Sequence, residues 1–298
     1  MASENITICP VCNHDTFSPY NSAKDYTVSG EVFTLIQCSA CQFIITSPRP
    51  AKNSIARYYL SDDYISHSGK SKTLFDKIYL TARKFTLKWK HQLIADHSTH
   101  AQAILDYGCG TGEFLKHMKN RGWQIEGVEP AANARTKANE QLGNAVSETL
   151  QTVKLQSFNI ITLWHVLEHI HDLNDTIQHL KHLLAKDGKM IIAVPNPKSH
   201  DSQNYQNNWA GYDVPRHLWH FTQSTMDALL KKNGLKIVET RPMKLDSYYV
   251  CLLSEGYNNL KQHKLISGIK ALIEGTLSNR KAKKSKEYSS LTYIAKSA

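Results

Sequence analysis

The fold of this chain is decided by the stretch Leu105-Asp106-Tyr107-Gly108-Cys109-Gly110-Thr111-Gly112-Glu113-Phe114. A short apolar strand is predicted over 103–106, and a helix is predicted over 113–120. Glycines between a strand and a helix let the backbone turn tightly and approach a ligand without a Cβ in the way. In an open α/β sheet, ligands bind at the carboxyl ends of the strands. The stretch therefore predicts a ligand site where this strand ends.

The spacing of the glycines separates two kinds of cofactor. A dinucleotide loop needs Gly-x-Gly-x-x-Gly, and its third glycine would fall on Glu113, whose carboxylate would repel a pyrophosphate. The pattern here is Asp-x-Gly-x-Gly-x-Gly, from Asp106 to Gly112, and it suits a cofactor that carries no phosphate. Glu129 ends the next predicted strand, where a carboxylate can accept hydrogen bonds from both ribose hydroxyls. A nicotinamide dinucleotide is the alternative cofactor.

Strand patterns and helix patterns alternate from residue 101 onward. The predicted strands are 103–106, 124–129, 158–163, 190–194, 235–240 and 291–295. The predicted helices are 113–120, 133–142, 173–184 and 224–232. This alternation predicts an α/β domain with a mostly parallel sheet covered by helices on both faces.

These segments together resemble the class I S-adenosylmethionine-dependent methyltransferases, in particular the ubiquinone-type O-methyltransferases. Beside the glycine loop, the matching pieces are 127–130, 161–169 and 188–195. The resemblance implies a Rossmann-like sheet of seven strands with the last one antiparallel. It also implies that S-adenosylmethionine is the cofactor, with its methionine part at Asp106 and the glycines and its ribose at Glu129. The cofactor-binding residues on this basis are Asp106, Gly108, Gly110, Gly112, Phe114, Glu129, Pro130, Trp164 and His165.

Four of the six cysteines form two Cys-x-x-Cys pairs, Cys9 with Cys12 and Cys38 with Cys41. In a reducing compartment such pairs indicate metal before disulfide. Four thiolates can surround one Zn²⁺ tetrahedrally, and a closed site of that kind is structural. The segment is similar to the zinc-binding segment that precedes some bacterial methyltransferases, including sugar C-methyltransferases. We therefore expect a small zinc-binding knuckle in front of the catalytic domain.

Two segments hold candidates for the chemistry. His165, Glu168 and His169 stand three and four residues apart, so on a helix they would share one face. In ubiquinone-type enzymes the matching motif is Glu-x-x-Glu-His and can hold a divalent cation, but here His165 replaces the first Glu. His165 is instead a candidate base or cofactor contact. For His169 the alternatives are a catalytic role and a local hydrogen bond at the start of a helix.

The second segment is 196–221, which reads as a long loop rich in aromatic residues, His and Arg. Loops of this length inside compact domains are usually functional or disordered. We interpret the segment as a lid over the acceptor, with His217 or His220 as base and Arg216 as an anion contact. The alternative is a packed surface loop whose His side chains pair with the backbone.

The chain divides into three parts on these patterns. Residues 1–48 form the knuckle, 49–100 a helical connector that packs on the catalytic domain, and 101–298 the methyltransferase domain. In the connector an apolar stripe recurs at Phe75, Ile78, Ala82, Phe85, Trp89 and Leu93. Within the last part, 250–287 is a basic insertion before the final strand.

Composition limits the functional class. Of the 298 residues 41% are hydrophobic and 21% charged, which is typical of a globular protein, and the net charge is +10. No apolar run approaches the ~20 residues that span a bilayer, and the start lacks a signal-peptide pattern. We therefore expect a cytoplasmic protein without a membrane span. Basic stretches at 70–90 and 261–298 indicate either solvated helix faces or an acidic partner such as RNA.

Three functions compete on the sequence. The leading hypothesis is His-assisted transfer of a methyl group from S-adenosylmethionine to a small-molecule acceptor such as a quinone, a sugar or another metabolite. The second is a methyltransferase that acts on RNA or protein through the knuckle and the basic stretches. The third is a non-catalytic, zinc-bearing module that binds the cofactor or a partner, and the intact glycine loop with Glu129 argues against it.

Overall fold

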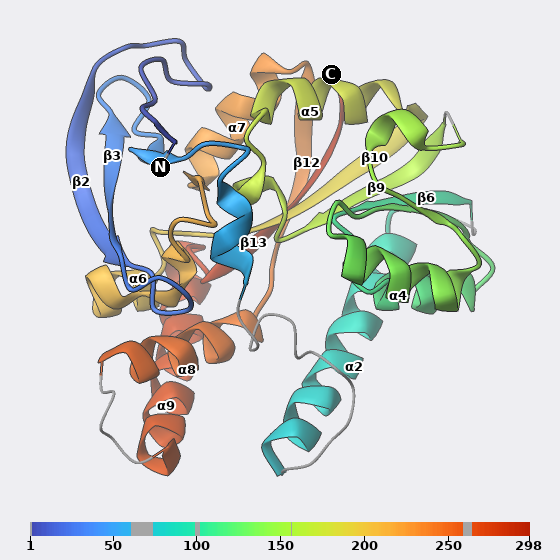
Figure 1. Cartoon of the computed structure of the whole chain (residues 1–298). Helices are drawn as coiled ribbons and strands as arrows, with labels where there is room; N and C mark the ends of the chain where they lie inside the picture. The colour runs from blue at the N-terminus through green and yellow to red at the C-terminus, as the bar shows by residue number, and fades with distance from the viewer. Residues whose placement is uncertain (1, 61–73, 99–101, 156, 259–263) are drawn as a thin grey trace.

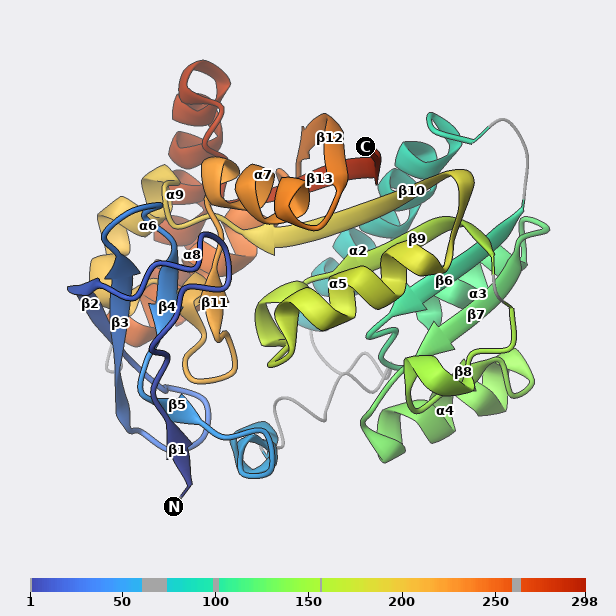
Figure 2. The same cartoon turned by 90° about the horizontal axis from the view of Figure 1, so that it is seen from above.

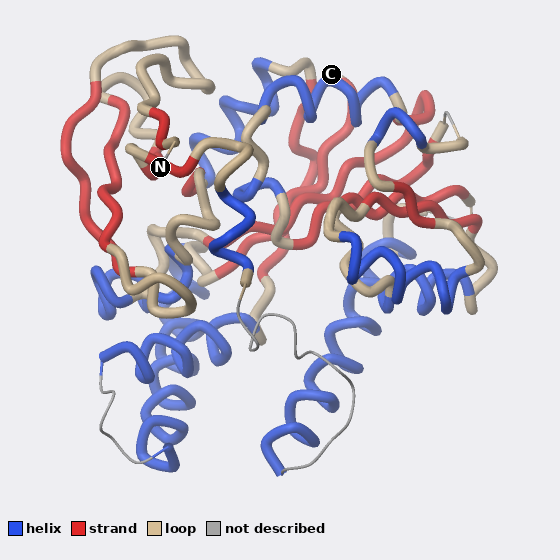
Figure 3. Tube along the Cα trace, viewed as in Figure 1, coloured by secondary structure: helices blue, strands red, loops and turns tan. Residues whose placement is uncertain are grey.

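The computed structural model describes residues 2–60, 74–98, 102–155, 157–258 and 264–298. A seven-stranded sheet runs through the molecule in the order β12-β13-β10-β9-β6-β7-β8 (Figures 1 and 3). Its strands are β6 (Ala103–Tyr107), β7 (Gln124–Val128), β8 (Val146–Ser147), β9 (Phe158–Trp164), β10 (Leu184–Pro195), β12 (Leu235–Pro242) and β13 (Ser290–Ser297). Strand β13 is antiparallel to both β10 and β12, and the other neighbours run parallel. The predicted sheet of seven strands with an antiparallel last strand is confirmed.

Helices cover both faces of this sheet, because successive residues of each buried strand point to opposite sides. On β9, Ile160 packs with α2, α3 and α4, whereas Ile161 packs with α5 and α7. The two layers are visible below and above the sheet in Figure 1. The helices of these layers are α2 (Leu74–Ala95), α3 (Glu113–Lys119), α4 (Ala132–Leu142), α5 (Leu173–His182) and α7 (Gln223–Lys232).

Several predicted boundaries differ from the structure. Helix α5 ends at His182, and β10 begins at Leu184 rather than at residue 190. The sequence Asp187-Gly188, which reads as a turn, lies inside β10 at a register shift against β9. A bulge accommodates such residues without ending the strand. Thr222 caps α7, with its side chain accepting from the Thr225 amide.

The apolar stripe of the connector is only partly buried. Leu93 is buried and Trp89 packs beside it, but Phe85 is 61% exposed. Helix α2 projects beyond the sheet in Figure 1, so only its carboxyl-terminal part reaches the core. The side chains of Phe75, Ile78 and Ala82 lie outside the described residues.

The amino-terminal unit is a second sheet, in the order β11-β4-β3-β2. Its own strands are β2 (Phe17–Lys24), β3 (Val32–Cys38) and β4 (Ile44–Thr46), while β1 (Ser3–Glu4) pairs with β5 (Arg49–Pro50). The fourth strand, β11 (Trp219–His220), comes from far along the chain and pairs with β4. The sheet that contains most of residues 1–48 thus includes one strand from the segment 196–221, and Arg49–Pro50 form the short strand β5.

The segment 196–221 is folded rather than a long loop. It contains α6 (His200–Tyr205), η4 (Gln206–Asn208), η5 (Ala210–Tyr212) and β11, and its side chains Trp209, Tyr212 and Leu218 are buried. Phe43 stacks on Trp219 at 5.9 Å between ring centroids, which ties the segment to the amino-terminal sheet. Figure 2 shows that this sheet lies at the carboxyl end of β10. The segment therefore connects the two sheets at the edge where α/β proteins bind ligands.

The expected basic insertion consists of two packed helices, α8 (Asp246–Asn258) and α9 (Lys264–Ser285). In Figure 1 they project from the same side of the sheet as α2. Among the described residues, no helix is both long enough and apolar enough to cross a bilayer.

Candidate functional site

The glycine loop joins β6 to α3, and its three glycines have different functions. All three have positive φ, at +74° for Gly108, +55° for Gly110 and +79° for Gly112. A Cβ at Gly108 would lie 2.5 Å from Val166 Cγ2, and one at Gly112 would lie 2.7 Å from Leu142 Cδ1. A Cβ at Gly110 would meet nothing within 4 Å. Gly108 and Gly112 therefore allow close packing, whereas Gly110 presents bare backbone to open space.

Two carboxylates flank this loop. Glu129 follows β7; its Oε2 accepts a hydrogen bond from the Gly110 amide at 2.8 Å and its Oε1 accepts from the Ala131 amide at 2.9 Å. Asp106 on β6 is 3% exposed and accepts from the Thr162 hydroxyl at 2.6 Å. Burial raises the pKa of Asp106 to about 7, although Thr162 and Lys90 oppose the shift. Pro130 follows Glu129 at the surface, and its carbonyl accepts from Arg135 at 2.8 Å.

Aromatic rings close one side of the loop. Phe114 at the start of α3 is buried and meets Trp164 edge-on at 5.7 Å between centroids. Lys90 of α2 lies over Trp164, with Nζ 4.3 Å from the ring centroid. Burial lowers the pKa of Lys90 to about 8, against the attraction of Asp106 and Asp246. The buried Trp164 Nε1 has no hydrogen-bond partner within the described part of the chain, so a bound group can accept from it.

His165 follows β9 with a φ of +57° and is held between two acids. Its Nε2 lies 2.9 Å from Asp246 Oδ2, and its Nδ1 lies 3.4 Å from Glu168 Oε1. Burial opposes the charged ring, but the contacts with Asp246 and Glu168 outweigh it and raise the pKa of His165 to about 10. An imidazolium cannot accept a proton, so this pairing argues against His165 as the base.

His169 and His217 lie together beside Glu168. Their rings meet at 4.7 Å between centroids, and His217 Nε2 lies 4.0 Å from Glu168 Oε1. The short 3₁₀ helix η3 (Leu167–His169) presents Glu168 and His169 in place of the expected helix start. The Leu218 amide donates to the Glu168 carbonyl at 2.8 Å, which brings His217 to this position. Burial lowers the pKa of His169 to about 4, and His217 adds to the effect.

His220 and Arg216 are buried, and both have partners inside the fold. His220 is buried in β11, with Nε2 3.0 Å from Thr46 Oγ1 and its ring edge-on to Tyr212. Arg216 is 1% exposed; it pairs with Asp213 and Asp25 and donates to the Tyr58 carbonyl. The partners of its Nε, Nη1 and Nη2 all lie inside the fold, so the structure gives no support for the anion contact expected at Arg216.

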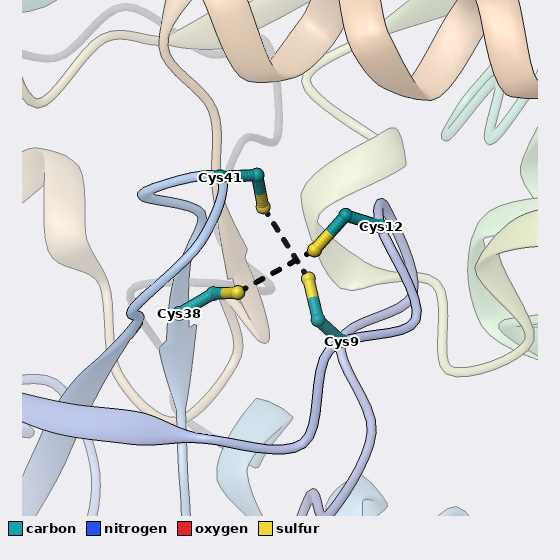
Figure 4. Close-up of side chains that lie close together, drawn as sticks. All are labelled: Cys9, Cys12, Cys38 and Cys41. Carbon is teal, nitrogen blue, oxygen red and sulfur yellow. Dashed lines mark hydrogen bonds between the residues drawn. The ribbon is translucent and has the colours of Figure 1, made fainter.

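The four paired cysteines meet at one point, as Figure 4 shows. Their sulfur atoms all lie within 4.8 Å of one another, with 3.5 Å between Cys9 and Cys41 and between Cys12 and Cys38. The two pairs lie in two turns of the same kind. In each turn the amide four residues after the first cysteine donates to the carbonyl of that cysteine. Sulfurs bound about 2.3 Å from one tetrahedral ion lie about 3.8 Å apart, whereas a disulfide spans about 2.05 Å. The spacing therefore fits an ion.

Three neighbours of the site were not found by sequence reasoning: Lys90, Asp213 and Asp246. Lys90 lies in α2 and Asp246 in α8, and both helices are distant in sequence from the glycine loop. Asp213 Oδ2 lies 3.8 Å from His217 Nε2, four residues along the chain. Residues 213–217 are not helical, so no spacing rule in the sequence could have indicated this contact.

Known proteins resemble this arrangement in sequence and in fold. A family model described as a methyltransferase domain matches residues 79–240, more than half of the chain. The ubiquinone biosynthesis O-methyltransferase of Glaesserella parasuis is 30% identical over 106 residues, which cover 31% of this chain and 45% of that protein. The enzyme of the same name from Coxiella burnetii is 26% identical over 159 residues, covering 49% and 62%. The chain thus spans about half the length of these curated relatives.

Two solved structures support the fold. The magnesium protoporphyrin IX methyltransferase of Synechocystis, solved with bound SAH, aligns with a TM-score of 0.51 at 15% identity, over 82% of this chain and 99% of that one. A SAM-dependent methyltransferase of Archaeoglobus fulgidus aligns with a TM-score of 0.50 at 18% identity, over 75% and 98%. On the domain match the chain belongs to the methyltransferase-domain family, and its fold is that of the class I S-adenosylmethionine-dependent methyltransferases.

Proposed function

We propose that this chain transfers a methyl group from S-adenosylmethionine to a hydroxyl of a small-molecule acceptor. The observation that carries the proposal is the open backbone at Gly110, held by Glu129 and followed at the start of α3 by Phe114, whose ring meets Trp164 edge-on. A cradle that a Cβ would fill, next to an acid and an orphaned indole N–H, fits a nucleoside cofactor without phosphate. The names of the relatives favour oxygen as the acceptor atom.

Each residue of the site then has a distinct part. Glu129 orients the ribose and fixes the loop, and ionised Asp106 attracts the amino group of the methionine part. When bound, S-adenosylmethionine supplies a methyl group on a sulfonium, and positioning is the main requirement of the displacement. On the acceptor side, His169 and His217 assist the removal of the proton from the acceptor hydroxyl. His165 is already paired with Asp246 and orients Glu168.

We infer that the cysteine cluster holds a structural Zn²⁺. All four thiolates point at one centre, so no coordination position is left for a substrate (Figure 4). The cysteine cluster lies between the amino-terminal sheet and the main core, since Cys9 and Cys38 pack in the same apolar cluster as residues of α5 and α7. The ion would therefore support the carboxyl edge of the sheet rather than take part in the transfer.

The acceptor class is tested by transfer of a labelled methyl group. Purified protein is incubated with methyl-labelled S-adenosylmethionine and separate panels of phenols, catechols and sugars, with Glu129→Ala as the cofactor-site control. The proposal expects acceptor-dependent transfer by wild type that the control lacks. Binding of S-adenosylmethionine without transfer to any panel would instead favour a binding module.

Replacing His217 by Ala is expected to slow the transfer by about 10²- to 10⁴-fold, the usual range for loss of acid–base assistance. The KM for S-adenosylmethionine should stay the same, because His217 belongs to the segment before β11 and not to the glycine loop. Steady-state kinetics with the acceptor found above measure both quantities. An unchanged kcat would remove His217 from the mechanism.

Cofactor affinity is expected to fall below pH 7. Asp106 attracts the cofactor's ammonium group only when ionised, and its pKa is about 7. Above that pH the carboxylate is charged, and each unit below weakens binding by roughly tenfold. Titrations at pH 6.0 to 7.5 stay below the pKa of Lys90, which is about 8. Asp106→Asn should bind weakly at every pH in this window, and a flat profile in wild type would contradict the assignment.

A further inference from the structure

Helix α9 carries large apolar side chains on its outer surface, whereas an ordinary surface helix turns its apolar stripe toward the core. Among its described side chains, those exposed in the amino-terminal half are Leu265 (67% exposed), Ile266 (47%), Ile269 (51%), Leu272 (59%) and Ile273 (60%). At about 100° per residue these positions cover an arc of about 120° on one side of the helix. We refer to these five residues as the apolar end of α9.

The inner face of α9 consists of small residues instead. The residues that pack inward recur at three- and four-residue steps and are Ser267, Ala271, Gly275, Ser278 and Ala282. A Cβ at Gly275 would lie 2.7 Å from Tyr248 Cδ1, so α8 approaches α9 closely at this glycine. The Ser278 hydroxyl donates to the buried Asp201 at 2.6 Å. Small residues at the contact between helices are typical of proteins whose large side chains face lipid.

Basic residues follow the apolar end along the helix. Those exposed in the carboxyl-terminal half are Arg280, Lys281, Lys283 and Lys284. They lie about 10 to 17 Å beyond Ile273, at a rise of about 1.5 Å per residue. Lys270 is exposed within the apolar end, and a lysine stem can extend past apolar neighbours to place its ammonium in a polar layer. The one acid in the sequence of α9, Glu274, is half-buried, so the exposed surface of the helix is strongly cationic.

The apolar end lies far from the main sheet. Only residues 286–289 separate the carboxyl end of α9 from β13, so the amino-terminal half of the helix extends away from the sheet (Figure 1). Helix α2 projects on the same side of the sheet. There Phe85 is 61% exposed, and the neighbouring Lys84 and Lys88 are exposed as well. A second projecting helix therefore combines an exposed apolar side chain with exposed cations.

We propose that the apolar end of α9 attaches the protein to the surface of a bilayer that contains anionic lipids. The Leu and Ile side chains enter the boundary between headgroups and acyl chains, and the basic residues behind them contact lipid phosphates. Charge complementarity favours this partner over a second copy of the chain, because two copies would bring the same cations together. A protein partner would favour aromatic anchors, whereas the apolar end consists of Leu and Ile. The attachment does not depend on the proposed methyl transfer.

Flotation with lipid vesicles tests the attachment. The full chain is mixed with vesicles of phosphatidylcholine alone or of phosphatidylcholine with phosphatidylglycerol. Wild type should float with the anionic vesicles, and added salt should weaken the binding. The double variant Leu272→Ser/Ile273→Ser should lose lipid affinity by about tenfold or more, because two side chains no longer leave water. The matched control Val32→Ser/Val238→Ser removes two apolar side chains that are exposed elsewhere and should bind like wild type.

Charge variants separate a specific surface from general adsorption of a cationic protein. Lys283→Gln/Lys284→Gln should weaken binding to the anionic vesicles by about tenfold or more. Lys186→Gln/Lys236→Gln removes two lysines that are exposed elsewhere and should bind like wild type. Equal losses in the two lysine pairs, or undiminished binding of Leu272→Ser/Ile273→Ser, would overturn the proposal.

A wild-type protein that does not float with the anionic vesicles would also overturn the proposal, and light scattering would then identify the occupant of the apolar end. A dimer that Leu272→Ser/Ile273→Ser converts to a monomer would assign this surface to a second copy of the chain. A wild-type monomer would leave it to a different protein.

Discussion

Gly110→Arg is expected to abolish cofactor binding, with at least a 100-fold loss of affinity for S-adenosylmethionine. The space beside Gly110 is open within 4 Å, so an added side chain fills the cradle instead of disturbing the core. The guanidinium also brings a positive charge toward a cationic sulfonium. Calorimetric titration of the variant measures the loss directly.

Gly143→Arg is the matched control for this variant. Gly143 closes α4 with a φ of +74°, and a Cβ there would also meet nothing within 4 Å. Both substitutions place the same side chain on a left-handed backbone at a cost of about 1–2 kcal/mol. The two variants should therefore lose similar thermal stability, while only Gly110→Arg loses the cofactor. Normal affinity in Gly110→Arg would show that the cofactor does not approach this loop.

Cys38→Ser is expected to remove the zinc ion and unfold the amino-terminal sheet. Apparent binding free energies of structural Zn²⁺ are about 10–16 kcal/mol, as large as the whole stability of an ordinary domain. Because β11 pairs with β4, the loss should extend to residues around Trp219 and His220. Metal analysis and hydrogen exchange over β2 to β4 measure the two effects.

Cys251→Ser provides the comparison, since Cys251 is as buried as Cys38 but lies outside the cluster. It should keep the zinc ion and leave hydrogen exchange in the amino-terminal sheet unchanged. Wild type that contains no zinc yet keeps this sheet protected would contradict a structural metal.

The glycine loop and the alternation of strands and helices could be predicted because both are local patterns. Each depends on residues that are neighbours in sequence, such as the glycines from 108 to 112. The cysteine cluster could be predicted for the same reason, because the two cysteines of each pair are only three residues apart. Local order thus indicated the sheet, the loop and the cysteine cluster.

The acceptor side depends on contacts between distant segments, which spacing cannot reveal. His165 meets Asp246 across 81 positions, and Arg216 meets Asp25 across 191. The pairing of β11 with β4 turns the expected lid into part of a second sheet and buries His220. A side chain such as Arg216, which the sequence suggests could bind a ligand, therefore forms ion pairs with residues that only the folded chain brings near it.

Binding of S-adenosylmethionine to the loop between β6 and α3 is measured by titrating the wild-type protein with this cofactor in a calorimeter. We expect micromolar binding near one cofactor per chain, with no comparable heat from a nicotinamide dinucleotide. A folded, zinc-containing protein that does not bind S-adenosylmethionine, or that binds the dinucleotide more tightly, would contradict it.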